Sequence, residues 1–88
     1  MDIRIHNTED AVPVIAALAT KAIASGGHEG HDLEAVGERM TRTEILDRIR
    51  TGYERHIARG ASPKAAVIAV GQVLVATYCD RAGIPTTR

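Results

Sequence analysis

The sequence predicts a small all-α domain, in which two C-terminal helices form an antiparallel hairpin packed on an N-terminal helix. Apolar residues recur at helical spacing over long segments, and helix-capping residues stand at the segment boundaries. The chain has 88 residues and only two aromatic side chains, Tyr53 and Tyr78. We therefore expect one domain over residues 1–88, with a light core of Ala, Val, Ile and Leu.

The N-terminal third of the chain contains a strand-like segment and a helix. Residues 1–6 alternate apolar and polar side chains, which is the period of a short strand that would need a partner. A helix is expected over about residues 8–25, with Thr8 as its N-cap. Pro13 is awkward inside this helix because proline donates no backbone hydrogen bond. The glycines that follow predict a flexible loop over residues 26–31.

Two further segments lead into the predicted hairpin. Asp32 is suited to cap a short helix that runs through Arg39. The next helix has the clearest start signal, because Thr41 and Glu44 form a T-x-x-E capping box, and Gly60 is its natural end. Its apolar face consists of residues at helical spacing: Ile45, Leu46, Ile49, Tyr53 and Ile57.

The last element is expected to be one helix from Ser62 to Ala82. Ser62 followed by Pro63 is an N-cap with proline at the first helical position, and Gly83 is a stop signal. This helix is apolar on nearly every side, so it belongs at the centre of a core or at a dimer seam. The residues expected at such a seam are Val67, Val70, Leu74 and Tyr78.

A β-hairpin is the alternative for the middle of this last element. β-branched residues on both sides of Gly71 and Gln72 favour two short strands with a Gly-X turn. The caps at both ends and the many alanines favour the single helix instead. Residues 84–88 are expected to form a loose tail.

Charge is divided along the chain although the net charge is zero. Residues 1–40 carry three basic and seven acidic side chains, and residues 41–88 carry eight basic and four acidic ones. This division favours head-to-tail self-association or an anionic partner. The single cysteine, Cys79, excludes an internal disulfide and fits a cytoplasmic protein. The apolar run over residues 65–78 is shorter than a membrane span, so no membrane association is expected.

Two groups of side chains are candidate sites. His28 and His31 stand three apart beside acidic residues and are of the type that ligates zinc or nickel. Their H-E-x-H order differs from the H-E-x-x-H of zinc proteases, so a solvated polar loop is the favoured interpretation and no cofactor is expected.

The second candidate is a basic stripe for anion or nucleic-acid contact. Arg48, Arg55 and Arg59 fall within about 40° of one another on a helix, and Lys64 extends the stripe. Guanidinium groups suit phosphates or carboxylates. The alternative is a solvated helix face with ion pairs, which the neutral net charge favours.

No catalytic constellation or glycine-rich phosphate loop stands in the sequence. We therefore predict a non-enzymatic binding or regulatory protein, of the inhibitor or accessory type. It is expected to form a homodimer and to act on a protein partner through a surface. The alternatives are a nucleic-acid-binding accessory protein that uses the basic stripe and a metal-binding protein that uses His28 and His31.

Overall fold

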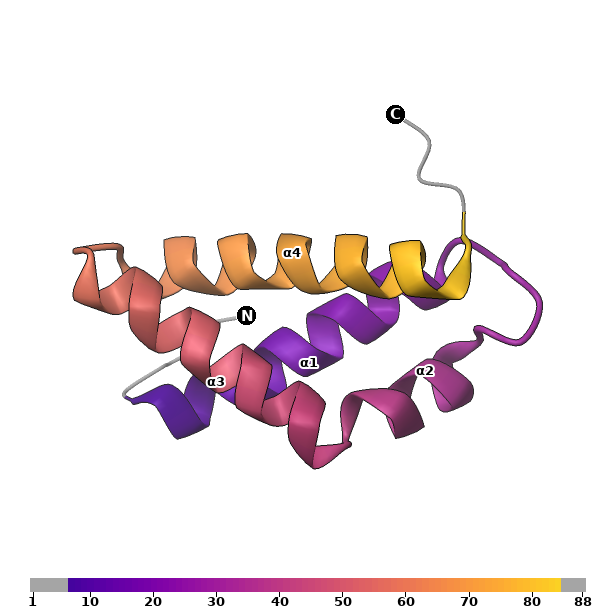
Figure 1. Cartoon of the computed structure of the whole chain (residues 1–88), viewed down its shortest axis with the longest axis horizontal. Coiled ribbons are helices and arrows are strands. Elements are labelled where there is room, and N and C mark those ends of the chain that lie inside the picture. Colours follow the sequence, from indigo (N-terminus) through magenta and orange to yellow (C-terminus); the bar gives the residue numbers. More distant parts are fainter. Residues whose placement is uncertain (1–6, 85–88) are drawn as a thin grey trace.

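The computed structural model describes residues 7–84 and folds this range into four α-helices. In Figure 1, α4 lies along the top of the molecule, α1 crosses beneath it, and α3 diverges from it after a short connection. The all-α fold class and the packing of the N-terminal helix against the last helix are confirmed. The predicted strand over residues 1–6 lies outside the described residues. The helix bounds are α1 (Thr8–Ala24), α2 (Leu33–Met40), α3 (Thr43–Ala58) and α4 (Pro63–Ala82).

The start of α1 differs from the prediction by one residue. Asn7 is the N-cap, and its side chain accepts a hydrogen bond from the backbone N–H of Asp10 at 2.9 Å. Thr8, the predicted cap, is instead the first helical residue. The helix also continues through Pro13, whose missing N–H leaves the Glu9 carbonyl without a helical hydrogen bond.

The predicted capping box at the start of α3 is wrong. Thr41 is the C-cap of α2, and its hydroxyl donates to the Glu38 carbonyl at 2.7 Å. The N-cap of α3 is Arg42, which makes no side-chain capping bond. Only two residues separate the helices, so Thr41 closes the first and is not available to open the second. The predicted cap of α2 is confirmed, since Asp32 accepts from the Ala35 N–H at 2.8 Å.

The last element is a single helix, and the alternative β-hairpin is wrong. Ser62 accepts from the Ala65 N–H at 3.2 Å, and Gly83 ends α4 with φ 71°, a backbone conformation that glycine adopts without strain. The N–H of Ile84 donates to the Cys79 carbonyl at 2.9 Å, and the Ile84 side chain is buried in the core. Ile84 therefore belongs to the helix end, although the predicted tail begins there.

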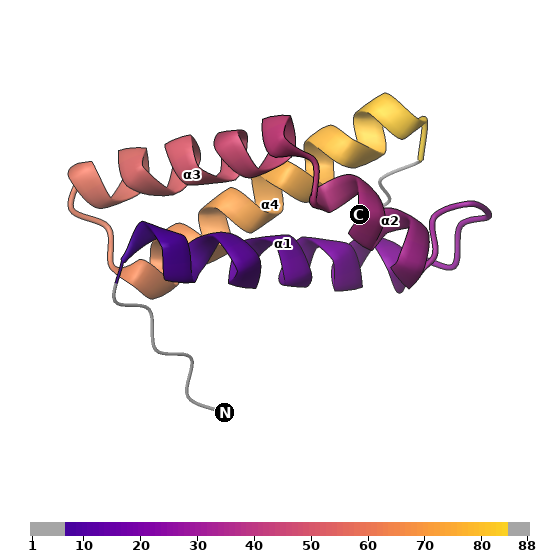
Figure 2. The ribbon, with the colours of Figure 1, turned by 90° about the horizontal axis from the view of Figure 1, so that it is seen from below.

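The core consists of two clusters along α1 and α4. Figure 2 shows α1 and α3 side by side with α4 across them, and α2 beyond the N-terminal end of α3. The cluster between α1, α3 and α4 contains Ala11, Val12, Ile15, Ile49, Tyr53, Ala66, Val67 and Val70. The cluster between α1, α2 and the end of α4 contains Ala19, Ile23, Val36, Met40, Cys79 and Ile84. Burying one Ile side chain contributes about 1.5–3 kcal/mol, so these clusters hold the four helices together.

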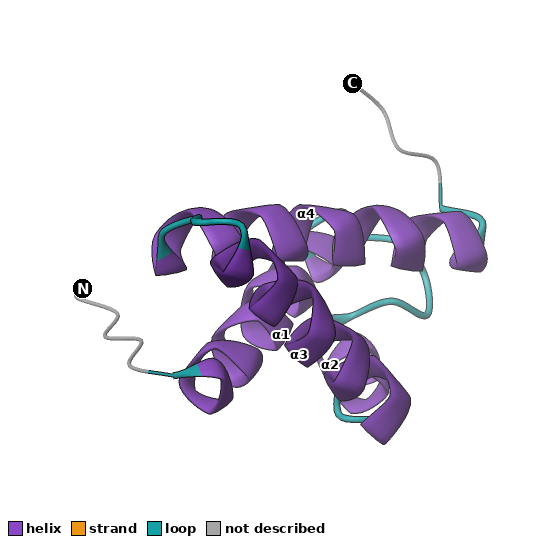
Figure 3. Ribbon diagram, turned by 60° about the vertical axis from the view of Figure 1, so that its left-hand side comes forward, coloured by secondary structure: helices purple, strands orange, loops and turns teal. Residues whose placement is uncertain are grey.

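The helix α4 is only partly covered by the rest of the chain. It lies across the outside of the other helices in Figure 3, and only 22% of its most apolar 18-residue stretch is buried. Ile68 and Val73 keep 50% and 63% of their surface exposed. By length and composition α4 is also apolar enough to cross a membrane. Core helices of soluble proteins can have the same length and composition. A substantial apolar surface of α4 therefore stays uncovered.

Candidate functional site

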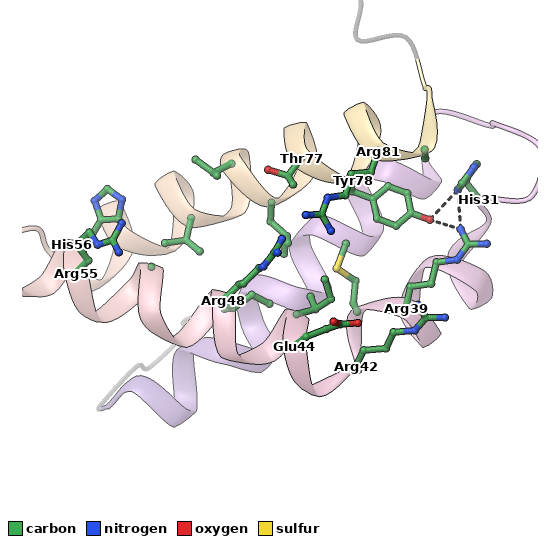
Figure 4. Close-up of a pocket in the computed structure, with 18 residues that line it drawn as sticks. His31, Arg39, Arg42, Glu44, Arg48, Arg55, His56, Thr77, Tyr78 and Arg81 are labelled. Carbon is green, nitrogen blue, oxygen red and sulfur yellow. Dashed lines mark hydrogen bonds between the residues drawn. The ribbon is translucent and has the colours of Figure 1, made fainter.

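A groove of about 560 Å³ lies between α3 and α4 and is bounded at one end by residues from the α2 region. Figure 4 shows its polar side chains along both long edges. Its apolar lining consists of Met40, Ile45, Ile49, Val70, Val73 and Leu74, among others. Five guanidinium groups line it as well, and we call it the cationic groove: they belong to Arg39, Arg42, Arg48, Arg55 and Arg81.

Helical spacing explains how α3 and α4 present these residues together. The lining residues of α3 recur at steps of three and four along one face: Glu44, Ile45, Arg48, Ile49, Gly52, Arg55 and His56. Those of α4 follow the same steps: Val70, Val73, Leu74, Thr77, Tyr78, Arg81 and Ala82. Each helix therefore contributes both aliphatic residues and arginines to the groove.

The cationic groove carries a large excess of positive charge. Its lining holds five arginines against one carboxylate, that of Glu44. Within residues 7–84, the guanidinium groups of Arg42, Arg48, Arg55 and Arg81 form no ion pair. A low-dielectric surface lined by charge of one sign concentrates ions of the opposite sign. The described part of the groove is therefore positively charged and its charge is largely uncompensated.

Three side chains form a hydrogen-bonded cluster at the α2 end of the groove. The Arg39 guanidinium donates through Nη1 to the Tyr78 hydroxyl and to His31 Nδ1, the latter at 3.0 Å. The Tyr78 hydroxyl lies 2.8 Å from His31 Nδ1, and the two rings meet edge to face. Since a guanidinium can only donate, Nδ1 of His31 must accept, which places the imidazole proton on Nε2. Figure 4 shows how the cluster ties α2, its preceding loop and α4 together.

A second groove lies on another side of α3, between α1, α2 and α3, with a volume of about 730 Å³. The arginine that lines this second groove, Arg50, forms ion pairs with carboxylates. Arg50 binds Glu9 at 2.7 Å and Asp47 at 2.8 Å. The hydrogen bond from Arg50, aided by its charge, lowers the pKa of the Glu9 carboxyl, and the same contact raises the pKa of Arg50. This groove is therefore locally neutralised where the cationic groove is not.

The basic stripe predicted from the sequence is divided by the structure. Arg48 and Arg55 line the cationic groove, while Arg59 and Lys64 are exposed outside it. Sequence reasoning missed Arg39, Arg42 and Arg81, which reach the groove from the α2 region and from the end of α4. Helical spacing within one segment could not reveal them, because they are brought together by packing between segments.

The residues predicted at a dimer seam also fall into two groups. Val67 and Val70 are buried in the core of a single chain. Leu74 and Tyr78 are partly buried and line the cationic groove. A homodimer stays a prediction, and the apolar surface that α4 leaves for it includes Ile68 and Val73.

The histidine pair is not arranged as a metal site. No group of three or more His, Cys, Asp or Glu side chains among residues 7–84 is placed to hold a metal ion. His31 instead accepts from Arg39, and a positive guanidinium 3.0 Å from Nδ1 opposes a second cation there. His28 packs beside Gly26 in the loop.

Comparison with known proteins gives no match to this chain, whether among family models, curated proteins or solved structures.

Proposed function

We propose that this protein is a non-enzymatic binding protein that takes an acidic amphipathic helix of a partner protein into the cationic groove. The observation that carries the proposal is the combination of an apolar lining with guanidinium groups that lack carboxylate partners among residues 7–84. An amphipathic helix with Leu or Ile on one face and Glu or Asp along its margins complements both features.

The apolar lining favours a protein segment over a nucleic acid. Val73 lies in the groove with 63% of its surface exposed, beside other aliphatic side chains. Sites for single-stranded nucleic acids use aromatic side chains for base stacking, and the tyrosine among the lining residues, Tyr78, is hydrogen-bonded to Arg39 and His31. Arg59 and Lys64, which a phosphate backbone would reach, lie outside the lining.

The same side chains support a binding role over catalysis. The lining residues include one carboxylate, Glu44, so paired acid and base carboxylates are not available among them. The hydroxyl groups of Thr77 and Tyr78 are the oxygen nucleophiles of the lining, and the nearest base to Tyr78, His31, accepts from Arg39 at the same nitrogen. These residues position one another and leave the groove as a docking surface.

The proposal is tested with two double variants of equal charge change. R48E with R55E reverses two charges inside the groove, and R59E with K64E reverses two exposed charges outside it. The probe is a fluorescently labelled helical peptide of about 18 residues, with leucines on one face and glutamates beside them. We expect the groove variant to weaken peptide affinity by at least about tenfold, which corresponds to 1.4 kcal/mol, and the outer variant to change it little.

The outcomes separate the possible occupants. Equal loss of affinity in both variants, or binding of a leucine-free acidic peptide as tightly as the probe, overturns the proposed site. Salt-sensitive binding of a short DNA duplex that depends on Arg59 and Lys64 would assign the basic residues to nucleic acid instead. Light scattering that shows a dimer, dissociated by R48E with R55E, would make a second copy the occupant.

A further inference from the structure

One arginine of this protein shows how its guanidinium holds a carboxylate. Arg50 presents the edge formed by Nε and Nη2 to Glu9, with Nε 2.7 Å from Oε1 and Nη2 3.3 Å from Oε2. Its third nitrogen, Nη1, binds Asp47 Oδ1 at 2.8 Å. One edge therefore takes a carboxylate in a two-pronged contact, while the remaining nitrogen fixes the orientation of the group.

Arg39 resembles Arg50 in that its Nη1 is hydrogen-bonded within the protein, but it differs in that its Nε and Nη2 edge has no partner among residues 7–84. Its Nη1 is held by the Tyr78 hydroxyl and by His31 Nδ1. Its Nε and Nη2 form no hydrogen bond with any of residues 7–84. Because Nη1 points toward Tyr78, the Nε and Nη2 edge points away from Tyr78. Arg39 stands at the α2 end of the cationic groove, where Figure 4 also shows Arg42. The fork that Glu9 fills on Arg50 is thus open on Arg39.

We infer that Arg39 is the residue that binds a carboxylate of the ligand in a two-pronged contact, and that Tyr78 and His31 position it. The inference rests on the proposed function and adds the ligand chemistry at one end of the groove: a planar carboxylate, from an Asp or Glu side chain or from a peptide C-terminus.

Pre-organisation distinguishes Arg39 from the other arginines of the groove. A long side chain loses rotamer freedom when it binds, and a side chain already held in place loses less. Arg48, Arg55 and Arg81 make no hydrogen bond with residues 7–84 that would hold their guanidinium groups, whereas Arg39 is held at Nη1 by two side chains. Arg39 should therefore contribute geometric selectivity, while the others contribute long-range attraction.

The inference is tested with a variant that keeps the positive charge at position 39 but lacks the guanidinium edge that binds a carboxylate through two nitrogens. Arg39→Lys retains a positive charge but cannot make the two-pronged contact, and Arg59→Lys is the matched control outside the groove. We expect R39K to weaken binding of the leucine and glutamate probe peptide at least about fivefold and R59K to leave it unchanged. Tyr78→Phe, which removes one positioning hydroxyl without changing charge, should weaken binding by a smaller factor of about two to three.

A direct measurement covers the case in which R39K perturbs the fold. In the wild-type protein, the Nε–H resonance of Arg39, assigned by its absence in R39K, should shift downfield when the probe peptide is added. Peptides with a free and an amidated C-terminus, and with Gln in place of Glu, identify which carboxylate is bound. A probe that binds without moving this resonance, or with equal affinity to R39K, overturns the role of Arg39 but leaves the proposed groove intact. Absence of any probe binding overturns the proposed function itself.

Discussion

The two grooves beside α3 differ in what their arginines contact. In the groove between α1, α2 and α3, Arg50 is paired with Glu9 and Asp47, so its charge is used inside the protein. In the cationic groove, Arg39 is held by the neutral groups of Tyr78 and His31, which orient it without neutralising it. The charge of a paired arginine is compensated inside the protein, whereas an oriented but uncompensated arginine can pair with the carboxylate of the ligand that we propose.

The largest effect that we expect comes from supplying the missing carboxylate inside the cationic groove. Val73→Glu places an acid among its lining residues, where it would pair with guanidinium groups and repel an acidic ligand. We expect affinity for the probe peptide to fall by at least about tenfold. Ile68→Glu is the matched control, because Ile68 is an exposed aliphatic residue of the same helix that does not line the groove.

Equal losses of affinity in V73E and I68E would contradict the contrast between the two grooves. They would show that general charge repulsion or the exposed apolar surface of α4 governs binding, and not the groove. Circular dichroism of both variants checks that α4 stays helical.

An intermediate effect is expected from two helical glycines, one lining each groove. A Cβ on Gly52 of α3 would lie 3.4 and 3.5 Å from the two methyl carbons of Val70, and a Cβ on Gly37 of α2 would lie 3.8 Å from the Thr20 methyl. Both are ordinary contacts, so Ala in place of either glycine should stabilise its helix by about 0.5–1 kcal/mol. Urea unfolding measures this change.

The two glycine variants should differ in ligand binding. Gly52 lines the cationic groove, so G52A narrows it and should lower affinity for the probe peptide, while G37A should leave that affinity unchanged. A decrease of affinity in G37A as large as in G52A would mean that both grooves respond together and are not independent surfaces.

The smallest effect is expected from the paired arginine at low pH. Arg50 lowers the pKa of Glu9 in the folded state, so the pair stabilises the fold above the ordinary Glu pKa of about 4.3. This stabilisation is lost as the pH falls through the lower folded value. Glu9→Gln removes it at every pH, so between about pH 5 and pH 3 its Tm should fall less than that of the wild-type protein. Because Glu9 is exposed, the difference should be small, and an identical acid-side decline in both proteins would show that the pair contributes nothing.

Much of the fold could be predicted from the sequence, because local signals act within one segment. Ser62 and Gly83 mark the ends of α4, and Asp32 caps α2, through contacts with residues a few positions away. The wrong prediction for Thr41 arose because local signals can fit two different roles. Its side chain fits the start of one helix and the end of the preceding one, and only the spacing of the two helices in the fold selects the second role.

The candidate site was predictable only where it follows one helix. Arg48 and Arg55 share a face of α3, and that face can be read from their spacing. The cluster that organises the end of the groove joins His31 to Tyr78 across 47 positions and Arg39 to Tyr78 across 39. Periodicity within a helix carries no information about such distant pairs.

By itself, the sequence determined that the chain forms helices, where most of them begin and end, and that the last one is too apolar to be solvated on all sides. The tertiary structure alone decided which arginines obtain internal carboxylate partners and which do not. The physical reason is that helix formation depends on neighbours three and four residues apart, whereas charge compensation depends on which side chains the packing of separate helices brings within hydrogen-bonding distance.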